Sequence, residues 1–191
     1  VVYYTNGYYI YCIDQLGYPP RRVFNFHSIE ELELLKLRRT MRQDIANPRI
    51  DDAITNRDYQ KNAIRSVCKA FRDLRRRSLL VMATGTGKTY TAFQIVYRLL
   101  QSGMKRKILY LADRNILVDQ SIQQDFAPLE KVTHQINVAK DDKSTITSHQ
   151  VYFSLYQQLV GDDDQEHFSE LFSPDFFDLI IVDECHRGSA K

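Results

Sequence analysis

A glycine-rich stretch at residues 83–89, Ala-Thr-Gly-Thr-Gly-Lys-Thr, has the residue types that hold a chain of phosphates. Its glycines allow the backbone to turn its N–H groups inward and to approach an anion closely. Lys88 can reach the outer phosphates, and the hydroxyl of Thr89 can ligate Mg²⁺. The predicted nucleotide-binding residues of the loop are Gly85, Thr86, Gly87, Lys88 and Thr89.

This loop departs from the strict phosphate-binding pattern at one position. The pattern G-x-x-x-x-G-K-[ST] requires a glycine at position 82, where this chain has Met82. A glycine-rich turn with a surface lysine is therefore the alternative interpretation. We favour the phosphate loop because an apolar run precedes it and a helical pattern follows it, as the mechanism requires.

A second constellation lies about a hundred residues later, where an apolar run ends in two acids. Leu179–Val182 is followed by Asp183 and Glu184. An aspartate at a strand end can hold Mg²⁺, and the next carboxylate can orient or deprotonate an attacking water. With Lys88, these residues form the predicted catalytic set for hydrolysis of ATP with Mg²⁺. Taken alone, the two acids could also be a solvated turn.

The elements that must position these residues alternate between strands and helices. Apolar runs predict four buried strands, at 78–82, 107–112, 151–155 and 179–182. Helical spacing of apolar residues predicts helices from about 57 to 77, from the loop to about 101 with Gly103 as the stop, and from 116 to 125. This alternation predicts an α/β fold with a parallel sheet, in which ligands bind beyond the carboxyl ends of strands.

The first forty residues have a different pattern. Asn6-Gly7 between β-forming residues predicts a hairpin with a type I′ turn. Ser28 and Glu31 have the spacing of a capping box, which predicts a helix to about Arg39. One hairpin and one helix cannot bury a core alone. We therefore expect residues 1–40 to be the tail of another domain, 41–55 a linker, and 56–191 the nucleotide-binding domain.

Composition excludes several classes of protein. No apolar run approaches the roughly 20 residues that cross a bilayer, so no membrane association is expected. Three cysteines are too few and too scattered for a disulfide framework or a zinc site, and they fit a reducing cytoplasm. The formal net charge of +2 is too small to argue for nucleic acid by itself. The chain starts at Val1 without an initiator Met, which suggests a fragment or a processed start.

Taken together, the motifs resemble those of superfamily 2 helicases and translocases. Residues 82–89 and 183–186 resemble motifs I and II of that superfamily. Three further segments resemble its adenine-recognising Gln segment, its motif Ia and a later DNA-side motif: 57–60, 109–120 and 151–159. Asp-Glu-Cys-His-Arg-Gly at 183–188 is close to the form in the motor (R) subunit of type I restriction-modification enzymes, and Tyr4-Thr5-Asn6-Gly7 resembles the closing hairpin of that subunit's nuclease domain.

This resemblance implies an ATP-fuelled translocase on double-stranded DNA with a RecA-like fold. It also implies an attached PD-(D/E)xK nuclease domain, and a methyltransferase subunit and a specificity subunit as partners. Gln60 would read the adenine edge, and Arg57 would stack on or flank the base; a solvated helix residue is the alternative for each.

The same resemblance implies DNA contacts from two later segments. Arg114 and Asn115 would contact DNA phosphates, unless they only cap a surface helix. Tyr156 and Gln157 are weaker DNA candidates, and packing of the Tyr156 ring is at least as good an interpretation. The cluster Arg75–Arg77 is interpreted as a solvated helix end, with a weak DNA contact as the alternative.

Parts of such a motor are not found in this sequence. A superfamily 2 motor needs a second RecA-like lobe with an arginine finger, and no nuclease carboxylate constellation is recognisable in residues 1–40. We therefore expect this stretch alone to bind ATP weakly, to turn it over very slowly and to cut no DNA. Two other functions stay open: a repair or remodelling helicase of the same superfamily, and a DNA-binding scaffold with a regulatory nucleotide site.

Overall fold

The computed structural model describes residues 1–14, 20–40, 45, 55, 57–113, 125–137, 140–141, 146, 148–159, 168–173 and 175–185. These residues fall into two compact units. The first unit comprises residues 1–87 and 98–104, and the second comprises 88–97 and 105–191.

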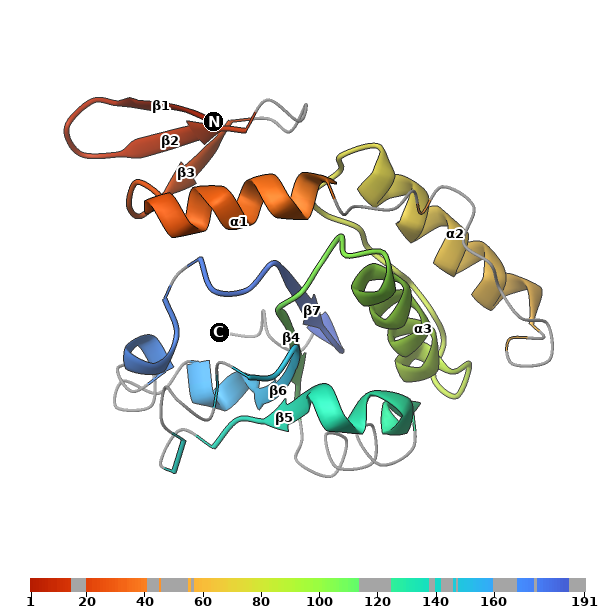
Figure 1. Ribbon diagram of the computed structural model, residues 1–191. Helices are drawn as coiled ribbons and strands as arrows, with labels where there is room; N and C mark the ends of the chain where they lie inside the picture. The colour runs from red at the N-terminus through yellow and green to blue at the C-terminus, as the bar shows by residue number, and fades with distance from the viewer. Residues whose placement is uncertain are drawn as a thin grey trace. The chain divides into compact units, whose positions relative to one another are not determined.

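The first unit begins with a small antiparallel sheet (Figure 1). Its strands β1 (Val2–Thr5), β2 (Ile10–Ile13) and β3 (Arg21–Val23) follow one another in order, so the predicted hairpin is confirmed. The predicted type I′ turn is wrong, because Thr5 pairs with Ile10 across a four-residue loop in which only Gly7 has a positive φ. The side chain of Asn6 accepts hydrogen bonds from the main chain of Tyr8 and Tyr9, and this local bond replaces the tight turn.

Helix α1 (Ile29–Thr40) starts with the predicted capping box. The main-chain N–H of Ser28 donates to the Glu31 carboxylate at 2.7 Å, and the N–H of Glu31 donates to the Ser28 hydroxyl at 3.2 Å. Each of these two side chains thus accepts a hydrogen bond from the main-chain N–H of the other residue. The predicted linker lies almost wholly outside the described residues; its two described members, Ile45 and Thr55, are buried.

Helix α2 (Asp58–Arg72) confirms the helical pattern that begins near residue 57. It buries Ile64, Val67, Cys68 and Phe71 along one face. Helix α3 (Lys88–Gln101) follows the glycine-rich loop and ends before Gly103, whose φ of 68° is the predicted left-handed stop.

The strand predicted at 78–82 is wrong. The run has no regular structure, and Leu79 and Val81 are 75% and 88% exposed. An apolar run forms a strand only where a neighbouring strand supplies a ladder of hydrogen bonds, and none among the described residues pairs with this one. Sequence hydrophobicity alone could not supply that information.

The second unit contains a parallel sheet in the order β5-β6-β4-β7 (Figure 1). Its strands are β4 (Ile108–Ala112), β5 (Thr133–Gln135), β6 (Val151–Leu155) and β7 (Leu179–Val182). The parallel α/β prediction and three of its four strands are therefore confirmed. The predicted helix at 116–125 lies outside the described residues except for its last position. Two short 3₁₀ helices, η2 (Ala127–Val132) and η3 (Tyr156–Leu159), adjoin β5 and β6.

Aromatic side chains fill both faces of this sheet. On one face, Tyr110 packs against Phe126 and Phe153, with ring centroids 5.8 and 5.0 Å away, and Phe93 of α3 packs edge-on against Phe126. On the other face, Tyr152 lies in a cluster with Phe168, Phe172, Phe176 and Phe177. Strand alternation separates the two faces, because Tyr110 and Phe153 pair in register while Tyr152 points the opposite way.

In the described part of the chain, no helix is long and apolar enough to cross a membrane. Cys12, Cys68 and Cys185 are all free thiols. Burial raises the pKa of the Cys68 thiol, which fits a packed side chain rather than a reactive one.

The start of β7 is tied to the start of β4 by one carboxylate. Asp178 accepts hydrogen bonds from the main-chain N–H groups of Arg106 (2.9 Å) and Lys107 (3.1 Å). Its own N–H donates to the Lys107 carbonyl at 2.8 Å. The side chain thus satisfies two donors that precede the β4 ladder and helps to set the register of both strands.

We expect Asp178→Ala to lower the free energy of unfolding by about 1–3 kcal/mol, because two part-buried N–H groups lose their acceptor. Asp178→Asn should lose less, since its amide oxygen can take the place of Oδ2 and accept from both N–H groups. Urea denaturation measures both variants, with Glu130→Ala at an exposed position of η2 as the control. An Asp178→Ala curve that matches the control would show that the carboxylate does not set this register.

Candidate active site

The glycine-rich loop has two residues in a backbone conformation that glycine adopts readily. Gly85 and Gly87 have φ values of 76° and 83°, a left-handed region that strongly favours glycine. Among the described residues, no atom beyond Gly85 and its chain neighbours lies within 4 Å of where a Cβ of Gly85 would stand. Gly87 is the N-cap of α3, and the N–H groups and the dipole at a helix start favour an anion.

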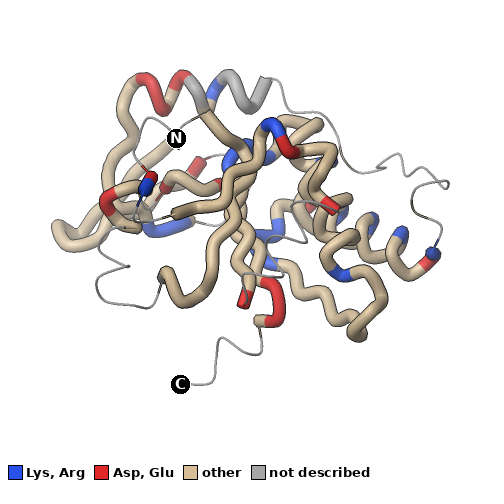
Figure 2. The backbone as a smooth tube through the Cα atoms, turned by 90° about the horizontal axis from the view of Figure 1, so that it is seen from below, with Lys and Arg blue, Asp and Glu red and all other residues tan. Residues whose placement is uncertain are grey.

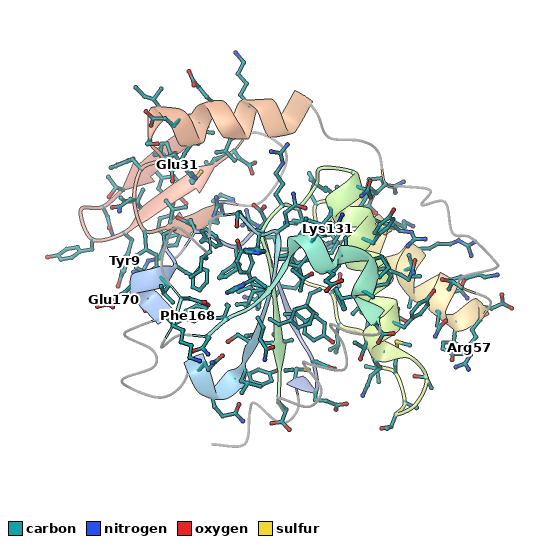
Figure 3. The ribbon with its side chains drawn as sticks, turned by 60° about the horizontal axis from the view of Figure 1, so that its bottom comes forward. Tyr9, Glu31, Arg57, Lys131, Phe168 and Glu170 are labelled. Atoms are coloured by element: carbon teal, nitrogen blue, oxygen red, sulfur yellow. The ribbon has the colours of Figure 1, made fainter. Side chains whose placement is uncertain are left out.

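The middle of the loop is held by side chains of α2. The hydroxyl of Tyr59 and the amide Nε2 of Gln60 both donate to the Thr86 carbonyl, at 3.0 and 2.9 Å. The Arg57 guanidinium in turn donates to the Tyr59 hydroxyl at 2.8 Å, and Figure 3 labels Arg57 at the start of this helix. Gln60 is buried, so its position is fixed by packing as well as by this bond.

This arrangement gives Gln60 a role that the sequence did not suggest. The sequence predicted contact with adenine, whereas in the structure one of its two amide hydrogens binds the loop. A primary amide has two hydrogens and an acceptor oxygen, so holding the loop and reading a base are compatible. Tyr59 was missed as a loop contact: the sequence presented it within the segment 57–60 and the helical pattern that starts there, and indicated no role of its own.

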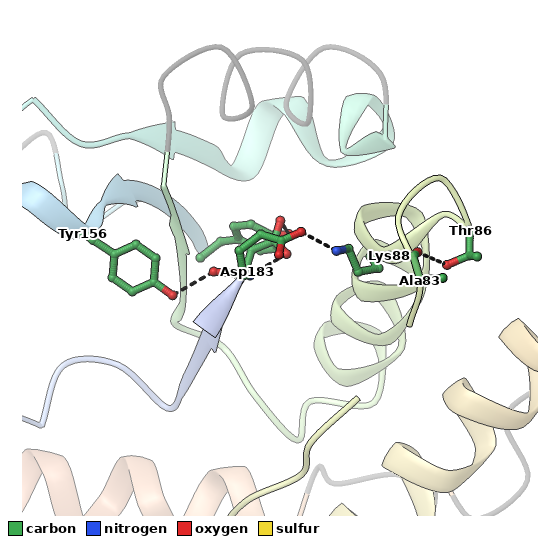
Figure 4. Close-up of polar contacts among 7 residues, drawn as sticks. Ala83, Thr86, Lys88, Tyr156 and Asp183 are labelled. Atoms are coloured by element: carbon green, nitrogen blue, oxygen red, sulfur yellow. Dashed lines mark hydrogen bonds and ion pairs between the residues drawn. The ribbon is translucent and has the colours of Figure 1, made fainter. Parts of the chain in front are cut away.

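In the second unit, Lys88 and Glu184 form an ion pair across 96 residues of sequence (Figure 4). Lys88 is the first residue of α3, and Glu184 follows the end of β7. Their side chains are 28% and 23% exposed, so the pair is partly shielded from water. The predicted phosphate-binding lysine and the predicted base are therefore brought together by the fold.

Four hydrogen bonds hold Asp183 in place. Its Oδ2 accepts a hydrogen bond from the Tyr110 hydroxyl at 3.1 Å, and its Oδ1 accepts one from the N–H of Glu184 at 2.9 Å. Its carbonyl accepts a bond from the Tyr156 hydroxyl at 2.8 Å (Figure 4), and its N–H donates to the Leu111 carbonyl at 2.9 Å. A carboxylate held at both oxygens has little freedom to turn.

Tyr110 is a buried residue of this site that sequence reasoning missed. Its pKa is raised far above the ordinary value of 10, first by burial and then by the charge of Asp183, while a hydrogen bond with Thr89 acts in the opposite direction. The phenol therefore remains a neutral donor at any physiological pH. A tyrosine within an otherwise aliphatic buried strand was the available signal, because a buried hydroxyl needs a partner.

The residues present fit a magnesium ion. Thr89 and Asp183 offer oxygen donors, which are the ligands that Mg²⁺ prefers, and the Tyr110 hydroxyl interacts with both side chains. The described residues contain no group of three or more His, Cys, Asp or Glu that could hold a metal alone. Mg²⁺ is usually bound by one or two protein ligands together with phosphates and water.

The predicted DNA contacts are only partly described. Arg114 and Asn115 lie outside the described residues. Gln157 is exposed, and its amide donates to the Asp113 carbonyl at 3.2 Å. The Tyr156 ring packs, partly buried, against the cluster around Tyr152, and its hydroxyl donates to the Asp183 carbonyl. Arg75–Arg77 are exposed beyond the end of α2, whose Lys and Arg residues Figure 2 marks in blue.

Comparison with known proteins finds restriction enzymes and DNA helicases among the relatives of this chain. The family model described as "Type III restriction enzyme, res subunit" matches residues 53–191. The type I restriction enzyme EcoAI endonuclease subunit of Escherichia coli is 49% identical over 136 residues, which cover 71% of this chain and 16% of that protein. The ATP-dependent DNA helicase MPH1 of Candida albicans is 29% identical over 140 residues, which cover 71% of this chain and 11% of that protein.

A solved structure is similar as well. It is that of a nuclease-deletion mutant of the Type ISP restriction-modification enzyme LlaGI in complex with a DNA substrate mimic. The match has a TM-score of 0.51 and 26% identity, and it covers 68% of this chain and 15% of that one. The chain thus spans 11–16% of the length of these three relatives.

The family model covers most of the chain, the described sheet has the parallel order of a RecA-like domain, and the matched residues include both the loop and the acids. The chain therefore belongs to the restriction-enzyme family described as the res subunit, with the helicase-like domain that its type I relatives share.

Proposed function

We propose that this chain binds ATP with Mg²⁺ and hydrolyses it as the first motor lobe of a type I restriction endonuclease subunit that translocates double-stranded DNA. The observation that carries the proposal is the approach of Lys88 to Glu184, because the fold joins the end of β7 to the start of the helix behind the loop. The relatives support restriction as the setting, and the motifs support ATP as the fuel.

Each side chain then has a defined task. The N–H groups of the loop and Nζ of Lys88 bind the phosphates, and the hydroxyl of Thr89 and the carboxylate of Asp183 hold the metal. When bound, Mg²⁺ neutralises charge on the outer phosphates. Glu184 accepts a proton at its carboxylate from the attacking water, or orients that water toward the phosphate.

The ion pair in the structure fits this sequence of events. While Lys88 is paired with Glu184, neither group is available for its task. A triphosphate carries more negative charge than a carboxylate, so its outer phosphates compete well for the Lys88 ammonium. Once the Lys88 ammonium binds the phosphates, the Glu184 oxygen that accepted from it can act on water.

The wider assignments rest on the family. We propose Gln60 and Arg57 as adenine contacts, and Arg114, Asn115, Tyr156 and Gln157 as contacts to the DNA backbone. We also propose a methyltransferase subunit and a specificity subunit as partners, a nuclease domain of which residues 1–40 are the tail, and the bacterial cytoplasm as the location. The relationship to the EcoAI endonuclease subunit supports a restriction enzyme as the setting, and the individual contacts and partners follow from the resemblance of the motifs.

The likeness to a DNA helicase favours one alternative, a repair or remodelling helicase. The higher identity to a restriction subunit, and the hairpin before the motor, favour restriction. A scaffold with a regulatory nucleotide site would leave biological activity intact after Lys88→Ala, whereas the motor proposal requires its loss with DNA binding retained.

Lys88→Ala should weaken binding of a fluorescent ATP analogue at least about tenfold, because a charge-assisted contact of roughly 1.5–3 kcal/mol is removed. Glu184→Gln should bind the analogue as well as the unmodified chain or a few-fold tighter. In that variant, binding no longer has to break the Lys88–Glu184 ion pair, which contributes up to about 1 kcal/mol. Fluorescence titration with Mg²⁺ present measures both.

Measuring hydrolysis separates the proposed role of Lys88 in binding from that of Glu184 in activating water. Phosphate release, which is expected to be slow in this chain alone, should fall below detection in Glu184→Gln although binding persists. DNA binding, followed by anisotropy of a labelled duplex, serves as the control for folding. Unchanged nucleotide affinity in Lys88→Ala would rule out the proposed site.

The adenine role of Gln60 can be separated from its hold on the loop. We expect Gln60→Ala to weaken ATP binding about tenfold and GTP binding much less, since an amide pairs with adenine but not equally with guanine. Tyr59→Phe removes the other bond to Thr86 and is the matched control. It should weaken ATP and GTP binding alike. Equal losses for both nucleotides in Gln60→Ala would assign Gln60 to the loop alone.

A further inference from the structure

We infer that Tyr110 is a positioning residue for the metal site: its hydroxyl, buried between α3 and β7, holds the Asp183 carboxylate and the Thr89 hydroxyl in the arrangement that receives Mg²⁺. The inference rests on the proposed function, which makes Asp183 and Thr89 the metal ligands, and it adds a residue that contacts neither nucleotide nor metal.

Strand register explains why the hydroxyl reaches the acid. Tyr110 pairs with Ile181 in the parallel ladder of β4 and β7. Side chains two residues apart point to the same face of a sheet, so Tyr110, Ile181 and Asp183 share one face. A diagonal neighbour lies roughly 7–8 Å away along the strands, which is within reach of a tyrosine side chain. The Tyr110 hydroxyl accordingly stands 3.1 Å from Oδ2 of Asp183.

The ring of Tyr110 has almost no freedom. Only 2% of the residue is exposed, and its ring is packed against Phe126 and Phe153. Phenylalanine would make the same ring contacts, so packing alone does not require a tyrosine here. The hydroxyl adds a polar atom at the end of this rigid side chain. It interacts with two side chains from different elements, Asp183 beyond β7 and Thr89 in α3.

Hydrogen bonds to both oxygens fix the direction in which the Asp183 carboxylate points. The N–H of Glu184 holds Oδ1 of Asp183, and Tyr110 holds Oδ2, so the plane of the carboxylate is set before any ligand arrives. Groups that orient metal ligands in this way contribute about 10–100-fold in metal affinity. The hydroxyl also couples the helix behind the loop to the strand that carries the acid.

The test is the Mg²⁺ dependence of nucleotide binding in Tyr110→Phe. A fluorescent ATP analogue is titrated with the purified chain at increasing Mg²⁺, and then with EDTA in place of the metal. We expect the half-saturating Mg²⁺ concentration to rise about tenfold or more, with metal-free binding of the analogue unchanged. The substitution keeps the ring, so the variant is expected to fold, and a urea curve without nucleotide checks this.

Tyr152→Phe is the matched control. Tyr152 is also a buried tyrosine of this sheet, but it lies on the opposite face of β6 and donates its hydroxyl to the His149 carbonyl at 2.7 Å. It loses the same group from an equally buried ring, so a merely structural effect would appear equally in both variants. Its Mg²⁺ dependence should match that of the unmodified chain.

The outcomes are distinct. If the unmodified chain binds the analogue with Mg²⁺ and Tyr110→Phe shows the same Mg²⁺ dependence, the inference is overturned and the proposed function stands. An equal shift in Tyr110→Phe and Tyr152→Phe also overturns it. If the unmodified chain binds no nucleotide at any Mg²⁺ concentration, the proposed function fails, and this inference fails with it.

Discussion

The parallel pairing of β4 with β7 is the constraint on which the site depends. Asp178 fixes the register where the two strands begin, and the bond from the Asp183 N–H to the Leu111 carbonyl fixes it where they end. A one-residue slip would turn Asp183 to the other face of the sheet. Because β4 is buried along its whole length, it provides a rigid reference for an edge strand that is half exposed.

The ion pair between Lys88 and Glu184 stabilises two partly buried charges when no ligand is bound. A lysine and a carboxylate, each about three-quarters shielded, would destabilise the fold if left without partners. Each neutralises the other, and the pair can be exchanged for a phosphate and a water. The groups proposed to act on the nucleotide therefore also stabilise each other in its absence, at little net cost in stability.

Local patterns in the sequence were sufficient where structure is decided locally. The capping box at Ser28 and the stop at Gly103 depend on neighbouring residues and formed as predicted. The run at 78–82 failed because a strand needs a distant partner, which hydrophobicity does not reveal. Tyr110 was missed for a related reason, since its role is set by register with a strand about seventy residues away. The loop and the acids could be named from sequence, but the bonds that hold them could not.

Two adjacent acids with different tasks require a break in the strand. In an extended chain, Asp183 and Glu184 would point to opposite faces of the sheet, and only one could reach the site. The strand ends at Val182, and Glu184 has a φ of 49°, a conformation that is uncommon and costs about 1–3 kcal/mol outside glycine. Glycine would remove this strain but also the carboxylate that meets Lys88. The conformation of Glu184 allows one carboxylate to face Tyr110 while the next faces Lys88, as the proposed division of tasks requires.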